Sequence, residues 1–347
     1  MKITFILPGR TSSGGVRCIS IIGQQLLDRG HQVRILSRRA TQTFRTRCRS
    51  LQSRWLYHAA PEWIRQFEGV VEDFTDIAQC TFQQDEILIA VGMAECAELD
   101  RCTWLPNLKI QYLHGSTPFS PELVKRALSL PYPKIVVASY LQDLVEVTGR
   151  RGNVIAVIHN GVDPQEYFCS VCESERDGVG MIYGNHPVKG PETTFQVIDR
   201  LLHLRPGVPI RVFSTDRRPR RIPASMYCRN PTLQRAREIY SRSLVWIIPS
   251  VSEGFALPIL EAMACGCVVV ATDCGGPRDI IKNGVNGFLV PVGDVAGIVS
   301  RVQLLLNDVE LRSSIRIQAK ETVRWFSWSR CVTRLENILE SSVQAFA

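Results

Sequence analysis

The side chains best suited to chemistry in this sequence are two glutamates, Glu253 and Glu261, with seven residues between them. They lie between two apolar runs, 244–249 and 267–271, and each run predicts a buried strand. Pro258 suits the first turn of a helix, because its φ is fixed and its missing N–H is not needed there. The pattern predicts a strand, an acidic turn, a helix and a second strand.

The predicted helix is expected to end at Gly266 and to carry Glu261 in its first turn. A helix N-terminus presents free N–H groups and partial positive charge, which suits a phosphate. From there Glu261 could reach a sugar diol, so the unit predicts a nucleotide-sugar site. A glycosidase pair is less favoured, since those carboxylates flank the bond from different elements. Glu253 directly follows a buried strand, which argues against an ordinary surface position.

A second candidate is the glycine pair Gly14-Gly15, between the first predicted strand, 3–7, and a helix. Gly9 and Gly14 have the spacing of a phosphate-binding P-loop, but the required lysine is absent, and no G-x-G-x-x-G motif occurs. Paired glycines still let a backbone approach a phosphate or sugar closely. The alternative is a flexible turn.

His114 and Lys189 each follow a predicted strand, 110–113 and 179–183. A neutral imidazole at His114 could hydrogen-bond a sugar hydroxyl or act as a base, although a lone histidine is more often structural. Lys189 precedes a helix beginning at Pro191 and could neutralise a phosphate, although exposed lysines are common. Both positions are at the carboxyl ends of strands, where α/β sheets bind ligands.

The elements that must position these side chains alternate as strands and helices along the chain, as in open, parallel α/β sheets. We predict an α/β protein of two doubly wound Rossmann-like domains facing across a cleft. The turn signals of 160–164 and the polar stretch to residue 177 suggest an interdomain linker. The predicted domains are 1–164 and 165–327, followed by a helix over 328–347 that packs back toward the first; the resemblance described below implies that 1–164 binds the acceptor and 165–327 the nucleotide-sugar donor. Predicted strands are 3–7, 33–36, 87–91, 110–113, 135–138, 154–158, 179–183, 210–213, 244–248, 268–271 and 287–290.

The composition fits a globular chain, with 347 residues, 45% apolar residues and a net charge of +8. No apolar run approaches the ~20 residues that span a bilayer, and residues 1–7 predict a strand rather than a signal peptide. A cytoplasmic protein is therefore the expectation.

The positive charge is concentrated in two arginine clusters, which attract anionic partners or form solvated basic faces. Lipid head groups or a phosphorylated substrate are the favoured partners, with peripheral contact to the inner face of an anionic membrane as one consequence. Nucleic acid is the weakest option, because no nucleic-acid motif is present. The clusters are Arg34, Arg38, Arg39, Arg45, Arg47, Arg49 and Arg54, and Arg217, Arg218, Arg220 and Arg221.

Twelve cysteines are present, and the pair Cys169 and Cys172 has C-x-x-C spacing. A structural zinc site needs a second pair at matching spacing, and Cys265, Cys267 and Cys274 do not supply one convincingly. No metal site is predicted.

The stretch from Ser250 to Asp294 closely resembles the retaining family 4 glycosyltransferases of the GT-B fold. The residues that carry the resemblance are Glu253, Gly254, Phe255, Pro258, Glu261, Gly266, Gly275-Gly276-Pro277 and Asn283 to Val290. Gly14-Gly15, Ser139, Asn160 to Asp163 and Lys189-Gly190 also match the family. Nearly the whole chain is covered, more weakly before Pro106.

The resemblance implies a role for each matching position. Lys189 would contact the donor diphosphate, Glu261 would hold the ribose, and Glu253 would contact the transferred sugar near its reacting carbon. Further contacts to the phosphates would come from backbone N–H groups of Gly254, Phe255 and Ala256 and from Gly14 and Gly15, with His114 facing the sugar. The family usually needs no bound metal.

One position departs from the family pattern. The family commonly has an arginine five residues before the lysine, where this chain has Gly184. His186 or an arginine from elsewhere is the candidate substitute, and without one the stabilisation of the leaving group is weaker.

The resemblance implies a glycosyltransferase that moves a sugar from a nucleotide diphosphate sugar to a carbohydrate or lipid-linked acceptor hydroxyl, with retention, in glycan biosynthesis. Same-face attack and a covalent intermediate both remain open. The alternatives are a catalytically weak or inactive nucleotide-sugar-binding partner in a glycan-assembly complex, suggested by Gly184, and a sugar-nucleotide epimerase.

Overall fold

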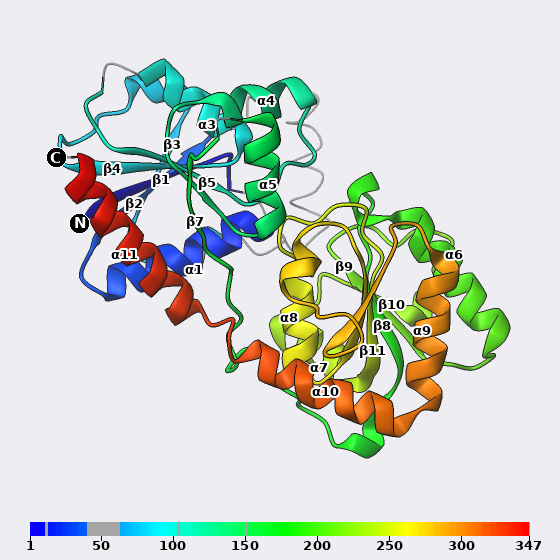
Figure 1. Cartoon of the computed structure of the whole chain (residues 1–347). Helices are drawn as coiled ribbons and strands as arrows, with labels where there is room; N and C mark the ends of the chain where they lie inside the picture. The colour runs from blue at the N-terminus through cyan, green and yellow to red at the C-terminus, as the bar shows by residue number, and fades with distance from the viewer. Residues whose placement is uncertain (11–12, 40–62, 103–104, 150, 347) are drawn as a thin grey trace. The chain divides into compact units, whose positions relative to one another are not determined.

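The computed structural model describes residues 1–10, 13–39, 63–102, 105–149 and 151–346 (Figure 1). The chain divides into two compact units: unit 1 is Met1–His159 with Trp328–Ala347, and unit 2 is Asn160–Ser327. The predicted boundary after residue 164 therefore falls a few residues inside unit 2.

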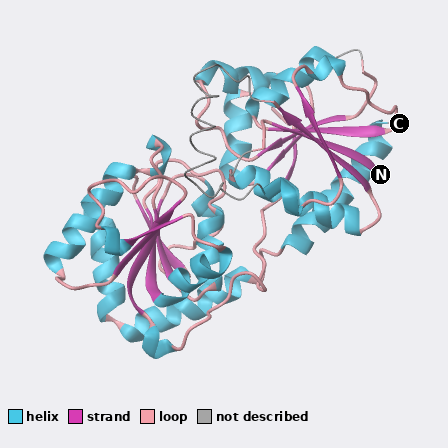
Figure 2. Ribbon diagram, turned by 180° about the vertical axis from the view of Figure 1, so that it is seen from behind, coloured by secondary structure: helices cyan, strands magenta, loops and turns pink. Residues whose placement is uncertain are grey.

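Unit 1 is built on a parallel sheet with the described strand order β3-β2-β1-β4-β5-β6-β7. Its central strands are apolar runs buried on both faces, as expected for a parallel sheet between helices (Figure 2). The strands are β1 Lys2–Leu7, β2 Gln32–Arg38, β3 Val70–Phe74, β4 Glu86–Val91, β5 Lys109–Leu113, β6 Lys134–Val136 and β7 Val154–Val157.

The α-helices of unit 1 are α1 Gly14–Asp28, α3 Met93–Leu99, α4 Pro121–Ser129, α5 Ser139–Thr148 and α11 Trp328–Phe346. The last helix packs beside α1 (Figure 1). Glu336 on α11 binds both the guanidinium of Arg29 at 2.8 Å and His31 Nε2 at 2.6 Å. These charged contacts fasten the C-terminal helix to the segment between α1 and β2.

Unit 2 contains a second parallel sheet, with the described order β10-β9-β8-β11-β12-β13. Its strands are β8 Asp177–Ile182, β9 Ile210–Ser214, β10 Tyr227–Arg229, β11 Ser243–Ile248, β12 Val268–Thr272 and β13 Gly287–Val290. Its α-helices are α6 Pro191–Leu204, α7 Leu233–Arg242, α8 Leu257–Ala264, α9 Val295–Asn307 and α10 Val309–Val323. A continuous apolar core joins the sheet to the packed faces of α6, α9 and α10.

The predicted strand–helix alternation is confirmed, but two strands were not predicted. β3 has mostly exposed or half-buried side chains, and β10 is only three residues long. Both lie at sheet edges. An edge strand buries little, so its sequence carries only a weak apolar pattern.

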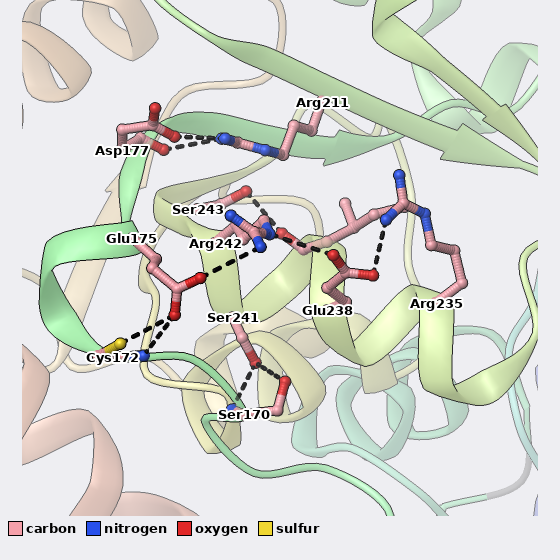
Figure 3. Close-up of polar contacts among 11 residues, drawn as sticks. Ser170, Cys172, Glu175, Asp177, Arg211, Arg235, Glu238, Ser241, Arg242 and Ser243 are labelled. Atoms are coloured by element: carbon pink, nitrogen blue, oxygen red, sulfur yellow. Dashed lines mark hydrogen bonds and ion pairs between the residues drawn. The ribbon is translucent and has the colours of Figure 1, made fainter.

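The stretch 160–177, predicted to be a linker, is part of unit 2. Polar contacts tie it to the end of α7 (Figure 3). Ser170 donates its backbone N–H to Ser241 Oγ at 3.0 Å, and Glu175 accepts from Cys172 N at 3.1 Å and pairs with Arg242 at 3.3 Å. Val162 and Tyr167 are buried, but most of the other side chains are polar and exposed, which explains why the sequence of this segment resembled a linker.

In the part of the chain that the structure describes, none of the helices combines the length and apolarity needed to cross a membrane.

Candidate functional site

Three loops of unit 2 meet at the edge of the sheet where β8, β11 and β12 end, which we call the carboxyl edge. The backbone N–H groups of Val251 and Ser252 donate to the carbonyl of Val188 at 2.8 and 3.2 Å. Glu253 N donates to Cys274 O at 3.1 Å, and Gly276 N donates to Glu253 O at 3.0 Å. These bonds fix the Glu253 turn between its two neighbouring loops.

Lys189 and Glu253 form an ion pair at the carboxyl edge. Lys189 Nζ lies 2.7 Å from Glu253 Oε1, and Ser250 Oγ donates to the same oxygen at 2.7 Å. The Glu253 side chain is 11% exposed, whereas the Lys189 side chain is 42% exposed. The structure therefore brings together the predicted phosphate lysine and the predicted sugar-facing carboxylate, with the lysine open to solvent.

Glycine is required beside this pair at Gly190. It has a left-handed φ of +63°, and a Cβ there would lie 2.1 Å from the Pro249 carbonyl oxygen. The close approach places the start of α6, with Pro191 in its first turn, against the end of β11. Lys189 is thereby held at the helix entry, as its spacing predicted.

The turn from Gly254 to Ala256 leads into α8. Phe255 and Ala256 are buried, so their side chains pack inside unit 2 and only their backbone is suited to a ligand. Ala256 has a φ of +72°, a left-handed conformation that strains a residue with a Cβ. Such strain concentrates at functional turns and fits the predicted phosphate-facing role of this segment.

Glu261 lies deeper than expected. The helix begins at Leu257, which puts Glu261 in the second turn, and the first turn carries no acid. The predicted first-turn position is therefore wrong, because the helix starts a residue before Pro258. Glu261 Oε2 accepts a 2.9 Å hydrogen bond from the buried hydroxyl of Tyr240 on α7. Burial, and then the Glu261 charge, raise the pKa of Tyr240 well above its usual range, so the hydroxyl remains a donor.

Ser250 and Tyr240 are the contacts that sequence reasoning missed. Ser250 lies two residues after the end of β11, next to the Glu253 turn, and this position was a usable signal. Tyr240 gave none, because only the packing of α7 beside α8 brings it to Glu261.

Gly184 lies directly beneath the lysine. A Cβ at this position would be 2.6 Å from Lys189 Cγ, so a side chain such as arginine would displace Lys189 from its observed position. His186, the candidate substitute, accepts a hydrogen bond from Val188 N at its Nδ1 at 3.4 Å, so this nitrogen already has a partner. Arg278 on the next loop pairs with Asp273. Both candidates are thus engaged by neighbouring residues in this arrangement.

Unit 1 contains the other predicted site residues at its own carboxyl edge. Gly14 and Gly15 open α1, with Ser13 capping the helix, and His114 follows β5. A Cβ on Gly15 would lie 3.6 Å from His114 Cβ, and a Cβ on Gly14 would meet no atom of the described residues within 4 Å. Gly15 and the histidine are neighbours, and none of the described residues fills the space beside Gly14.

His114 stacks beside Tyr112, with ring centroids 4.6 Å apart. Burial lowers the pKa of His114 to about 4, so the ring is neutral near pH 7. Its Nε2 is buried and finds no hydrogen-bond partner among the described residues. A neutral ring with an unused nitrogen suits a hydroxyl contact rather than charge stabilisation.

The arginine clusters are largely paired where the structure describes them. Arg34 pairs with Glu72 and Glu86, and Arg38 with Glu95 and Glu98. These contacts make Arg34 and Arg38 poor anion receptors. Arg39 is more exposed and lies 3.8 Å from Asp73, while Arg45, Arg47, Arg49 and Arg54 lie outside the described residues.

In the second cluster, Arg221 pairs with Glu192 and Asp199, and Arg218 donates to the Ile222 carbonyl. Among the described residues, no cluster of three or more His, Cys, Asp or Glu side chains could hold a metal ion.

Residues 229–322 match the family model described as Glycosyl transferases group 1. An uncharacterized glycosyltransferase of Methanocaldococcus jannaschii is 35% identical over 94 residues, which is 27% of each chain. The N-acetyl-alpha-D-glucosaminyl L-malate synthase of Bacillus anthracis is 35% identical over 102 residues, 29% of this chain and 27% of that protein. These alignments thus span about a quarter of the length of the relatives.

The structural likeness is more extensive. The Anabaena protein HepE, solved in complex with UDP-glucose, superposes with a TM-score of 0.75 at 17% identity, covering 98% of this chain and 100% of HepE. The predicted fold class, α/β with two Rossmann-like domains of the GT-B type, is confirmed. Residues 229–322, which carry Glu253 and Glu261 and which we call the group 1 segment, therefore match the Glycosyl transferases group 1 model within a chain of GT-B fold.

Proposed function

We propose that this protein is a glycosyltransferase that moves a sugar from a nucleoside diphosphate sugar to an acceptor hydroxyl with retention at the anomeric carbon. The observation that carries the proposal is the Lys189–Glu253 pair at the carboxyl edge. It places the accessible cation of Lys189 beside the carboxylate of Glu253, and Glu253 lies within the group 1 segment. A cation stabilises the negative charge that develops on the leaving diphosphate. A carboxylate stabilises the positive charge that develops on the oxocarbenium-like sugar.

The arrangement suggests how donor binding changes the pair. A diphosphate is a stronger ligand for Lys189 than a single carboxylate, because it offers more charge and more acceptor oxygens. Once Lys189 turns to the phosphates, the carboxylate of Glu253 is released to face the positive charge that develops on the sugar. One preorganised electrostatic contact of this kind supplies ~3 kcal/mol of transition-state stabilisation.

The remaining site residues have supporting roles in this proposal. The backbone of Gly254 to Ala256, at the N-terminus of α8, contacts the phosphates, and Glu261, oriented by Tyr240, holds the ribose. On unit 1, Gly14 and Gly15 admit the diphosphate and His114 contacts a sugar hydroxyl. The cation on the leaving group is Lys189 rather than a bound metal.

UDP-sugars are the first donors to test, because HepE is solved with UDP-glucose. We propose a carbohydrate or lipid-linked acceptor in glycan biosynthesis, with the protein in the cytoplasm and in peripheral contact with an anionic membrane.

The deciding experiment offers UDP-, GDP-, ADP- and dTDP-sugars with and without candidate acceptors. Acceptor-dependent release of nucleoside diphosphate supports transfer, and NMR of the product then reads the anomeric configuration. An inverted centre would refute retention. Conversion of the donor without an acceptor would instead indicate an epimerase.

One observation favours a second candidate function. Residue 184 is a glycine, and Lys189 occupies the space beside it. Position 184 therefore does not supply the second cation that the family pattern places on the diphosphate. The protein would then be a nucleotide-sugar-binding partner with weak or no turnover. Tight donor binding without acceptor-dependent release, across the whole panel, would support this alternative.

A further inference from the structure

A pocket of about 200 Å3 lies at the opposite edge of the unit 2 sheet, where β8 and β11 begin. Its charged lining comprises Arg176, Arg312, Arg316 and Glu173, and we call it the arginine pocket. Three guanidinium groups and one carboxylate leave a net charge of +2. Like charges gathered around a small space are unfavourable unless an anion compensates them.

Arg176 is the buried element of the arginine pocket, with a side chain that is 1% exposed. Two of its nitrogens are fixed by main-chain carbonyls: Nη1 donates to Cys265 O at 3.2 Å, and Nη2 donates to Gly266 O at 2.6 Å. Its Nε is buried, makes no hydrogen bond within the described chain, and lies 3.8 Å from the pocket carboxylate of Glu173. A rigid guanidinium thus keeps one unused donor beside the pocket.

Arg312 and Arg316 stand one turn apart on α10, so both side chains reach the same side of that helix. Arg312 Nη1 donates to Leu305 O at 2.6 Å, which holds one terminal nitrogen of the guanidinium in place. Arg312 also lines the pocket. Burial, together with the charges of Arg316 and Arg176, lowers the pKa of Arg312. Arg316 pairs with Glu173.

We propose that the arginine pocket binds a phosphate dianion, as inorganic phosphate or as a small phosphomonoester. Guanidinium groups match phosphate oxygens in geometry as well as charge. The Ser313 hydroxyl, which also lines the pocket, adds a further donor. The volume is below the ~300 Å3 at which pockets for drug-sized ligands begin, so the ligand is small.

The site is separate from the proposed donor site, because it lies at the other end of the strands. Arg176 nevertheless connects the two regions. It donates to the carbonyls of Cys265 and Gly266, which come directly after α8, and α8 is the helix that carries Glu261. The proposal does not depend on glycosyl transfer and is tested by binding alone.

The test is calorimetric titration of the full chain with inorganic phosphate, and separately with glycerol 3-phosphate, at constant ionic strength. We expect saturable binding at one site, weakened about tenfold or more in R312Q. E173Q should bind phosphate several-fold more tightly, because the competing carboxylate is neutralised while all three arginines remain. R324Q is the matched control, an exposed arginine beyond the end of α10 that does not line the pocket.

Tighter binding of glycerol 3-phosphate than of inorganic phosphate would identify a phosphomonoester as the ligand, and the reverse order would identify the free ion. The proposal is overturned if R312Q and R324Q bind equally, if E173Q binds more weakly than the unmodified chain, or if binding depends on Lys189 instead. Should R312Q fail to fold, the direction of the E173Q effect decides.

Discussion

Lys189 Nζ and Glu253 Oε1 are 2.7 Å apart, so the cation and the carboxylate proposed for opposite ends of the donor bond neutralise each other in the free protein. The pair is half open to solvent, because the lysine is much more exposed than the glutamate. Because solvent reaches the lysine, the pair adds only ~1 kcal/mol or less to stability. Its value therefore lies in chemistry rather than in folding.

Replacement of Lys189 by Met should lower kcat/KM for transfer by about a hundredfold, because ~3 kcal/mol of leaving-group stabilisation is lost. The free energy of unfolding should change by less than ~1 kcal/mol. Steady-state kinetics and urea unfolding measure the two effects. Lys282→Met removes an exposed lysine of the same unit and should leave both unchanged. Full activity in Lys189→Met would show that the lysine does not serve the diphosphate.

Replacement of Glu253 by Gln keeps the shape of the side chain and an oxygen for Ser250, but removes the charge. Turnover should fall by ~10²–10³-fold, as for removal of one electrostatic contact to a transition state. Affinity for the nucleoside diphosphate should be retained or should rise, since the diphosphate no longer competes with the Glu253 carboxylate for Lys189. Calorimetry gives the affinity and product release gives the turnover. Glu310→Gln, at an exposed position on α10, is the control, and equal turnover in the two variants would contradict the assignment.

Tyr240→Phe removes only the hydroxyl that donates to Glu261, leaving a buried carboxylate with one partner fewer. The free energy of unfolding should fall by ~1–3 kcal/mol. The dissociation constant for the nucleoside diphosphate should rise if Glu261 holds the ribose, whereas affinity for inorganic diphosphate should not change. Urea unfolding and calorimetry test the two parts separately. An unchanged nucleotide affinity in a destabilised variant would make the pair structural only.

Gly14→Ala and Gly276→Ala form a matched comparison. Among the described residues, nothing lies within 4 Å of a Cβ at Gly14, so the free energy of unfolding should change by less than ~0.5 kcal/mol. A Cβ at Gly276 would lie 2.4 Å from Phe255 Cα, and this overpacking should cost ~1–3 kcal/mol. Loss of donor affinity in the stable Gly14→Ala variant, seen by calorimetry, would indicate a ligand in the open space. Unaltered affinity would remove Gly14 from the site.

His114 should make stability depend on pH. Because burial lowers the folded pKa to about 4, the unfolded chain takes up a proton first as the pH falls. The contribution of His114 is fully present above the unfolded pKa of ~6.5 and is lost as pH falls toward the folded value. The stability difference between the unmodified chain and His114→Asn should therefore shrink between pH 7 and pH 4.5 in urea titrations. Parallel stability curves for the unmodified chain and His114→Asn across this pH range would contradict the burial argument.

The two parallel sheets follow from the amino-acid pattern alone, because their strands are apolar runs separated by helical spacing and turn residues. The same pattern also identifies polar residues beyond the strand ends: His114 comes directly after a predicted strand, Lys189 and Glu253 lie in the loops that follow two others, and each loop leaves the carboxyl edge of its sheet. The short edge strands β3 and β10 lacked this signal, since little of their surface is buried.

Which side chains meet at the site depends on the packing of the folded chain. The Lys189–Glu253 pair depends on how two loops cross at the carboxyl edge, and the Tyr240–Glu261 bond depends on the packing of α7 against α8. The arginine pocket likewise joins the start of β8 to α10. Such contacts join residues many positions apart, and their distances depend on backbone directions that no local spacing encodes. Local patterns therefore predict which elements form, whereas the pairing of charges at a site is settled by packing.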